Sequence, residues 1–135
     1  MARECLKHNK LDARMMGRIQ QLADKLDQLL LEPEHPSLIH GDMWTTNILV
    51  QNGRVTGFVD PALYYAHPEV ELAFSTLFGT FGRPFFDRYN ELRPLQPGFF
   101  EGRRDLYNLY PLLVHVRLFT GYVGSVDRIL HRFGV

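Results

Sequence analysis

Several features are scarce in this 135-residue sequence, and each absence narrows what the chain can be. The single cysteine, Cys5, excludes an internal disulfide framework and a cysteine-based zinc site, and it is typical of a reducing compartment. No apolar run approaches the roughly 18 residues of a membrane-spanning helix, and the N-terminus lacks the apolar core of a signal peptide. We therefore expect a cytoplasmic protein with no membrane partner.

An excess of charge of either sign is also missing, since Lys and Arg number 15 and Asp and Glu number 15. A surface that binds nucleic acid needs a basic excess, so no nucleic-acid partner is expected, and any phosphate site must be local. Apolar residues make up 45% of the chain, which is an ordinary globular composition. The length predicts one domain with a single core.

Hydrophobic periodicity predicts a largely helical chain with one β-hairpin. Apolar residues recur at three- and four-residue steps from Leu11, which predicts an amphipathic helix over residues 11–31 that ends before Pro33. Residues 1–10 show no periodic signal, and residues 61–68 read as a loop. The segment 69–133 reads as a helical subdomain, with helices expected over about 69–81, 85–92, 101–120 and 126–133.

The stretch with the most chemical content is residues 40–47, H-G-D-M-W-T-T-N, followed by Asp60. In the protein-kinase motif H-R-D-x-x-x-x-N, the Asp accepts the proton of the acceptor hydroxyl, while the Asn and a later Asp bind metal. Asp42 and Asn47 reproduce that spacing, with His40 at the His position. The pattern therefore predicts Asp42 as the catalytic base and Asn47 and Asp60 as ligands of the Mg²⁺ that accompanies ATP.

The segment 37–62 is predicted to form the catalytic loop and a hairpin. Asn52-Gly53 lies between two apolar runs, and this dipeptide is the strongest short-range hairpin signal because a type I′ turn needs positive φ at both central residues. The hairpin folds the chain back, so that Asn47 at its entrance and Asp60 at its exit are expected side by side. Mg²⁺ takes oxygen ligands of this kind, completed by water and phosphate oxygens.

Plainer interpretations remain open for several of these side chains. The plain alternative for Asp42 is a cap of its turn, and the kinase-like pattern is favoured over it. His40 is expected to support the loop through backbone hydrogen bonds, and Trp44 is expected either to stack on a substrate sugar or to pack against the loop. For Glu71 a bracing or capping role is favoured over a place near the magnesium. A metal-dependent hydrolase that uses Asp42, Asp60 and a histidine is a minor alternative.

Residues 38–47, L-I-H-G-D-M-W-T-T-N, together with residues 59–67, V-D-P-A-L-Y-Y-A-H, resemble the fructosamine kinase (ketosamine-3-kinase) family. The resemblance continues through residues 104–115 and covers about residues 11–130. It implies an α+β, mostly helical fold, which is the C-terminal lobe of a protein-kinase-like fold with one active-site β-hairpin. It also implies transfer of phosphate from ATP, with Mg²⁺, to a sugar hydroxyl of a ketosamine, such as a small-molecule or protein-bound fructosamine or ribulosamine adduct.

In this resemblance Asp42 matches the family's catalytic base, and Asn47 and Asp60 match its metal ligands. No Gly-rich loop and no lysine-bearing strand precede residue 11, so over residues 1–135 we expect the C-terminal lobe without the N-terminal ATP-clamping lobe, and little activity from this lobe alone. The face that the absent lobe would cover is expected to be apolar and to favour self-association. The alternatives are a truncated or pseudoenzyme lobe that acts as a non-catalytic binding module, and a related small-molecule kinase with an aminoglycoside- or choline-type acceptor.

Overall fold

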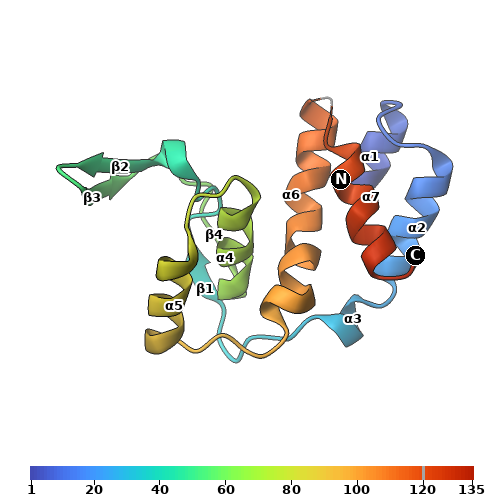
Figure 1. The fold of residues 1–135 in the computed structure, drawn as a ribbon. Helices are drawn as coiled ribbons and strands as arrows, with labels where there is room; N and C mark the ends of the chain where they lie inside the picture. Colours follow the sequence, from blue (N-terminus) through green and yellow to red (C-terminus); the bar gives the residue numbers. More distant parts are fainter. Residues whose placement is uncertain (120) are drawn as a thin grey trace. The chain divides into compact units, whose positions relative to one another are not determined.

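The computed structural model describes residues 1–119 and 121–135, which form two compact units (Figure 1). Residues 1–31 and 105–135 make up unit 1, and residues 32–104 make up unit 2. Nowhere in the described ranges does a helix reach the length and apolar character needed to cross a membrane.

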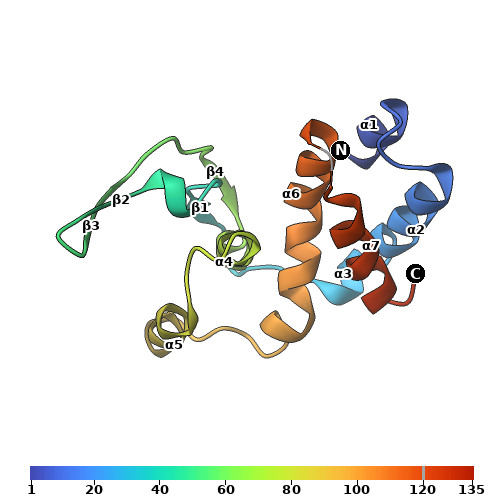
Figure 2. The same cartoon turned by 45° about the horizontal axis from the view of Figure 1, so that its top comes forward.

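Unit 1 is entirely helical, and Figure 2 shows its helices from a second direction. α2 packs on both α1 and α7. The centre of the unit consists of aliphatic side chains that are fully or almost fully buried, among them Leu22, Val116, Val126 and Leu130. The elements of this unit are α1 (Ala2–Lys7), α2 (Ala13–Ala23), α3 (Leu26–Leu29), α6 (Arg104–Leu118, whose first residue belongs to unit 2) and α7 (Val123–Arg132).

The first helix, α1, has no counterpart in the sequence prediction. Its one buried residue is Cys5, whose thiol donates a hydrogen bond to the carbonyl oxygen of Leu113 at 3.3 Å. Burial raises the pKa of the Cys5 thiol. A six-residue helix is marginal by itself, so the packing of Cys5 against α6 explains why this segment is helical without a periodic pattern.

The helix expected over residues 11–31 is instead two helices, because the chain turns at Asp24 and Lys25. Asp12 caps α2 by accepting a hydrogen bond from the backbone N–H of Met15 at 2.7 Å. At the other end, Asp24 accepts a hydrogen bond from the side chain of Gln20 at 2.8 Å. A negative charge is unfavourable at a helix C-terminus, and aspartate has a low helix propensity, so α2 ends there although the apolar spacing continues.

Unit 2 combines two small antiparallel sheets with two helices and a π-helix. α4 packs on β1, and the hairpin β2–β3 projects from the rest of the unit (Figure 1). The elements are β1 (Ser37–Ile39), a 3₁₀-helix (Thr45–Asn47), β2 (Ile48–Gln51), β3 (Arg54–Phe58), β4 (Tyr64–Ala66), α4 (Pro68–Leu77), α5 (Arg83–Leu92) and a π-helix (Phe99–Arg103).

The predicted hairpin is confirmed, including its turn type. Asn52 and Gly53 have φ angles of 52° and 72°, which are the two positive values that a type I′ turn requires. Ile48 pairs with Phe58, and a bulge interrupts the register beyond Leu49. The pairing extends to the residues at the base of the hairpin.

The segment expected to be a loop over 61–68 contains a strand, β4, which pairs with β1. Ile39 lies opposite Tyr64, and Ser37 lies opposite Ala66. Three residues give too short a pattern to read from sequence, and the pairing joins strands that are about 27 positions apart. The strand matters because it holds the two ends of the candidate site, at residues 40 and 62, next to each other.

A buried ion pair joins α4 to the π-helix of unit 2. Arg103 donates to Glu69 through Nε at 2.8 Å and through Nη2 at 2.7 Å. The same guanidinium donates to the carbonyl oxygens of Pro97 (2.7 Å) and Gln96 (2.8 Å). The π-helix, the loop before it and the first turn of α4 are therefore held by one side chain.

Candidate active site

The loop of residues 40–47 leaves β1 and enters the hairpin through the 3₁₀-helix. Gly41 has φ of +80°, and a Cβ at this position would lie 2.4 Å from the carbonyl oxygen of Ala62 and 2.7 Å from the ring of Tyr64. Ala62 in turn donates its backbone N–H to the carbonyl oxygen of His40 at 2.8 Å. Only glycine fits such a close crossing of two backbone segments.

The His40 ring connects the loop to the exit of the hairpin. Its Nδ1 accepts the backbone N–H of Asp42 at 3.3 Å, so the ring proton is on Nε2, which donates to the carbonyl oxygen of Val59 at 3.0 Å. Both ring nitrogens of His40 are therefore occupied by backbone groups.

Glu71 braces the same loop from α4. Its Oε2 accepts the backbone N–H groups of His40 at 2.5 Å and of Gly41 at 3.1 Å. Of the two roles considered for Glu71, bracing is the one with contacts in the structure. Its Oε1 is buried and has no hydrogen-bond partner among the described residues, so the carboxylate holds the loop through one oxygen.

Asn47 lies against Asp42 and is almost completely buried. Its Nδ2 donates one hydrogen bond to the Asp42 carboxylate (Oδ2, 2.8 Å) and one to the Asp42 carbonyl oxygen (2.9 Å). Both amide hydrogens are thus used on Asp42, and the amide oxygen remains available to a cation. The contact also orients the carboxylate of the half-buried Asp42.

The hairpin brings Asp60 to the same end of the site. Val59 donates its backbone N–H to the carbonyl oxygen of Asn47 at 3.0 Å, so the residue next to Asp60 is paired with the other predicted ligand. Asp60 itself has φ of 53°, a left-handed conformation that is uncommon outside glycine and that often marks a functional site. Its side chain is exposed, and no described residue donates a hydrogen bond to it.

This donor set fits Mg²⁺ but not a histidine-bound metal. Mg²⁺ is usually held by one or two carboxylate-type oxygens, with phosphate and water completing its shell, and the amide oxygen of Asn47 and the carboxylate of Asp60 are such donors. Among the residues that the structure describes, no three His, Cys, Asp or Glu side chains gather as a metal site. The hydrolase alternative, which needed Asp42, Asp60 and a histidine together, therefore has no ligand set in the described part of the chain.

Trp44 packs on the C-terminal end of α4. Its ring centroid lies 5.5 Å from that of Phe78, and Phe78 in turn meets Phe74 edge-on at 5.9 Å. The indole is half-buried, which leaves part of it at the surface beside Asp42. The structure therefore shows Trp44 in its packing role, and the exposed part of the indole is free to contact a sugar.

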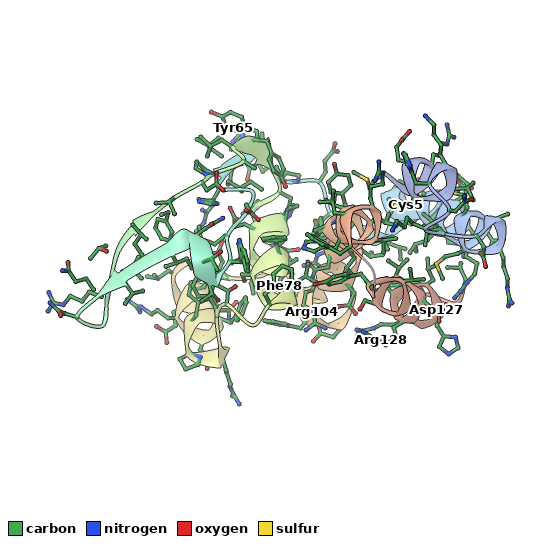
Figure 3. The ribbon with its side chains drawn as sticks, turned by 90° about the horizontal axis from the view of Figure 1, so that it is seen from above. Cys5, Tyr65, Phe78, Arg104, Asp127 and Arg128 are labelled. Carbon is green, nitrogen blue, oxygen red and sulfur yellow. The ribbon has the colours of Figure 1, made fainter. Side chains whose placement is uncertain are left out.

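The strands of unit 2 and the residues next to them carry a set of exposed apolar side chains. Tyr65 is 70% exposed and points outward from β4 (Figure 3). The other members of the set are Leu38, Leu49, Val50, Val55, Phe58, Val59, Leu63 and Tyr64.

The helical fold with its small sheets and one active-site hairpin defines the chain as a kinase-like C-terminal lobe. The sequence model of the fructosamine kinase family matches residues 1–133. The chain therefore belongs to the fructosamine kinase family.

Named relatives support this membership. A probable ketoamine kinase from Lactiplantibacillus plantarum is 38% identical over 115 residues, which cover 81% of this chain and 41% of that protein. A chloroplastic protein-ribulosamine 3-kinase from Oryza sativa subsp. japonica is 46% identical over 96 residues, covering 70% and 28%. A crystal structure from Thermobifida fusca YX-ER1, assigned as a fructosamine-3-kinase, is 35% identical with a TM-score of 0.83, covering 97% of this chain and 46% of that one. The chain thus spans less than half the length of these relatives.

Proposed function

We propose that this chain supplies the acceptor and metal half of an ATP-dependent ketosamine kinase, which phosphorylates a sugar hydroxyl of fructosamine or ribulosamine adducts. The observation that carries the proposal is the direct contact between Asn47 and Asp42, with the Asn47 amide oxygen left for a cation. The names of the relatives support the choice of ketosamines over aminoglycosides or choline as acceptors.

In this proposal Asp42 is the general base. The acceptor hydroxyl donates a hydrogen bond to the carboxylate, which orients it toward the γ-phosphorus of ATP. The carboxylate accepts the hydroxyl proton as the new O–P bond forms and the bond from that phosphorus to ADP breaks. Asn47 keeps the carboxylate in one orientation through its Nδ2, while His40 and Glu71 hold the backbone of the loop. A base that is already oriented before the substrate binds needs little reorganisation during the reaction.

Asn47 and Asp60 would hold Mg²⁺ through one amide and one carboxylate oxygen. When bound with ATP, Mg²⁺ supplies charge neutralisation on the phosphates and ATP supplies the phosphoryl group. Asp60 has a left-handed backbone conformation, and no described residue donates a hydrogen bond to its side chain. Both features support its use as a ligand.

The sugar of the acceptor is proposed to stack on the exposed part of Trp44, which stands two residues after the base. The proposed acceptor is a small-molecule or protein-bound ketosamine. The proposed location is the cytoplasm, whose reducing conditions are compatible with the buried free thiol of Cys5. We also propose that the exposed apolar side chains of the unit 2 strands are covered by self-association or by another polypeptide segment.

The test is ATP-dependent phosphorylation of a fructosamine by the protein as its gene encodes it. Asp42→Asn should lower turnover by about 100- to 10,000-fold, the usual contribution of a general base, while nucleotide still binds. Asp60→Ala should instead weaken Mg²⁺-ATP binding. The matched control is Asp27→Asn, an exposed acid on α3, which should leave both quantities unchanged.

The same assay decides between an enzyme and a non-catalytic module. Full activity of Asp42→Asn would refute the assignment of the base, and unchanged nucleotide affinity of Asp60→Ala would refute the metal ligand. A wild-type protein that binds fructosamine but transfers no phosphate under any condition would instead be the binding module.

A further inference from the structure

A cleft of about 790 Å³ lies within unit 2, apart from the residues of the candidate active site. Its walls come from α5, from the loop and π-helix that follow it, and from the turn between α4 and α5. This volume is within the range of small-molecule sites.

The chemistry of the cleft differs from that of a phosphate or sugar site. Four phenylalanine side chains contribute to its lining: Phe86 and Phe99 are buried, Phe81 is half-buried, and Phe100 is 41% exposed. Arg83 and Asp87 stand on the same stretch of lining, so that charges of both signs are present. A phosphate ligand requires an excess of cationic donors, but here two acids, Asp87 and Glu101, balance two arginines, Arg83 and Arg104. A bare sugar would leave the phenylalanines of the lining without an apolar partner.

The opposite charges at the cleft are loosely engaged with each other. Arg83 Nε lies 3.4 Å from Asp87 Oδ2, and both side chains are largely exposed. Exposed pairs of this kind hold weakly, so the pair is able to open toward a ligand that brings its own carboxylate and ammonium. A molecule with an apolar side chain and both charges is an amino acid or a short peptide.

One wall of the cleft is rigid before any ligand arrives. Arg103 holds the carbonyl oxygens of Gln96 and Pro97, and Asn90 Oδ1 accepts the backbone N–H of Leu95 at 2.8 Å. A preformed wall lowers the conformational entropy that binding would otherwise cost.

Aromatic rings lie both against the active-site loop and at the edge of this cleft. Trp44 packs on Phe78, which Figure 3 labels at the end of α4. Three residues later Phe81 lines the cleft and stacks on Phe85 with ring centroids 4.0 Å apart. The aromatic partner of Trp44 and the first cleft residue of this segment are thus three positions apart in the chain, which places the two sites close together in sequence within unit 2.

We propose that this cleft binds the amino-acid or peptide portion of the ketosamine, with its side chain on the phenylalanines and its charged ends on Arg83 and Asp87. The assignment rests on the proposed function, because it is that function which places a sugar at Asp42. It makes the cleft a site that selects which ketosamine is phosphorylated, separate from the site that performs the transfer.

The test is an amide chemical-shift titration of the protein as its gene encodes it, with two probes. The dipeptide Phe-Lys, with free termini and no sugar, should shift residues 81–87 and 95–101. The fructosamine of butylamine, which carries the sugar without amino-acid charges, should shift residues 40–47 instead. Phe-Lys glycated on its lysine should shift both sets and bind about tenfold more tightly than the butylamine adduct, which is about one well-made contact in affinity.

The matched variants are Arg83→Glu and Arg88→Glu, two charge reversals on α5 of which only the first lies in the cleft. Arg83→Glu should weaken Phe-Lys about tenfold or more, and Arg88→Glu should not change it. Phe100→Ala gives a second variant if the first does not fold. The proposal is overturned if Phe-Lys shifts no cleft residue at millimolar concentration, shifts residues elsewhere, or binds both variants equally. Phosphorylation of the butylamine adduct by the encoded protein is measured separately and tests the proposed function. That function can therefore be confirmed even if the titration refutes the assignment of the cleft.

Discussion

Replacing Arg103 with methionine should lower the free energy of unfolding by about 3–5 kcal/mol, because it breaks a buried ion pair from one side. Arg103 is 6% exposed and its partner Glu69 is 2% exposed. Methionine fills much of the volume of the arginine stem, but it cannot donate either of the two hydrogen bonds to the carboxylate. The Glu69 charge would then be buried without compensation.

The carbonyl oxygens of Gln96 and Pro97 should add little to this loss. Each now accepts from Arg103, and a buried acceptor that loses its donor costs about 1–3 kcal/mol unless water reaches it. The loop that carries them is at the surface, so part of this loss should be recovered by hydration.

The assay is urea unfolding followed by the fluorescence of Trp44, the single tryptophan of the chain. Because Trp44 lies in unit 2, its signal reports the unit that contains the ion pair. Arg88→Met is the matched control, since the Arg88–Glu91 pair at 2.6 Å is exposed and should contribute less than about 1 kcal/mol.

A double variant separates the ion pair from ordinary packing. Adding Glu69→Leu to Arg103→Met should recover part of the lost stability, because no unpaired charge remains buried. An Arg103→Met variant no less stable than Arg88→Met would refute the reasoning, and so would a double variant whose loss is the sum of two large single losses.

Two further predictions concern the loop brace and its helix. Glu71→Leu should remove the acceptor of the His40 and Gly41 backbone N–H groups, and so lower the turnover of the encoded protein about tenfold or more with a smaller change in nucleotide affinity; unaltered turnover would count against the brace. His67 accepts the backbone N–H of Glu69 at Nδ1, and its pKa is lowered, first by burial and further by Arg103, against an opposing effect of Glu69. The unfolded chain therefore binds more protons at His67 than the folded chain does. The stabilisation should be complete above the unfolded pKa of about 6.5, and it should be lost as the pH falls through the folded pKa. His67→Asn should flatten this pH dependence, and an unchanged profile would contradict the prediction.

The local features of the candidate site are readable from the sequence. Asn52-Gly53 predicts the turn type because the φ angles of that dipeptide are a local steric property. Once the hairpin is placed, Asn47 and the residue beside Asp60 must meet, because two antiparallel strands with a short turn have one register. The roles of Asp42, Asn47 and Asp60 as base and ligands stay predictions until activity and metal binding are measured.

The support of the site was harder to predict, since its contacts join distant residues. Glu71 reaches the loop from 30 positions away, and Gly41 needs to be glycine because Ala62 and Tyr64 cross it. In the sequence, only the H-G-D motif at residues 40–42 indicated that position 41 needs glycine. β4 was missed because a three-residue strand has no period to detect, and it forms because β1 offers it a partner.

In unit 1 as well, local sequence signals predicted the presence of a helix but not its boundaries. The apolar spacing predicted helical structure correctly across residues 13–23, but it could not show that the chain turns at Asp24, where the negative charge at the helix C-terminus and the low helix propensity of aspartate act against the continued pattern. α1 has no pattern of its own and depends on the burial of Cys5 against α6.

The sequence by itself determined the chemistry of the loop, the turn of the hairpin and the family, because residue types and short-range backbone preferences are carried by neighbouring positions. Only the tertiary structure decided what holds the loop, where the buried Glu69–Arg103 pair lies and that a cleft of mixed charge forms beside α5. Those features depend on which distant segments pack together, and packing is set by the free energy of burying them jointly rather than by any one stretch of the chain.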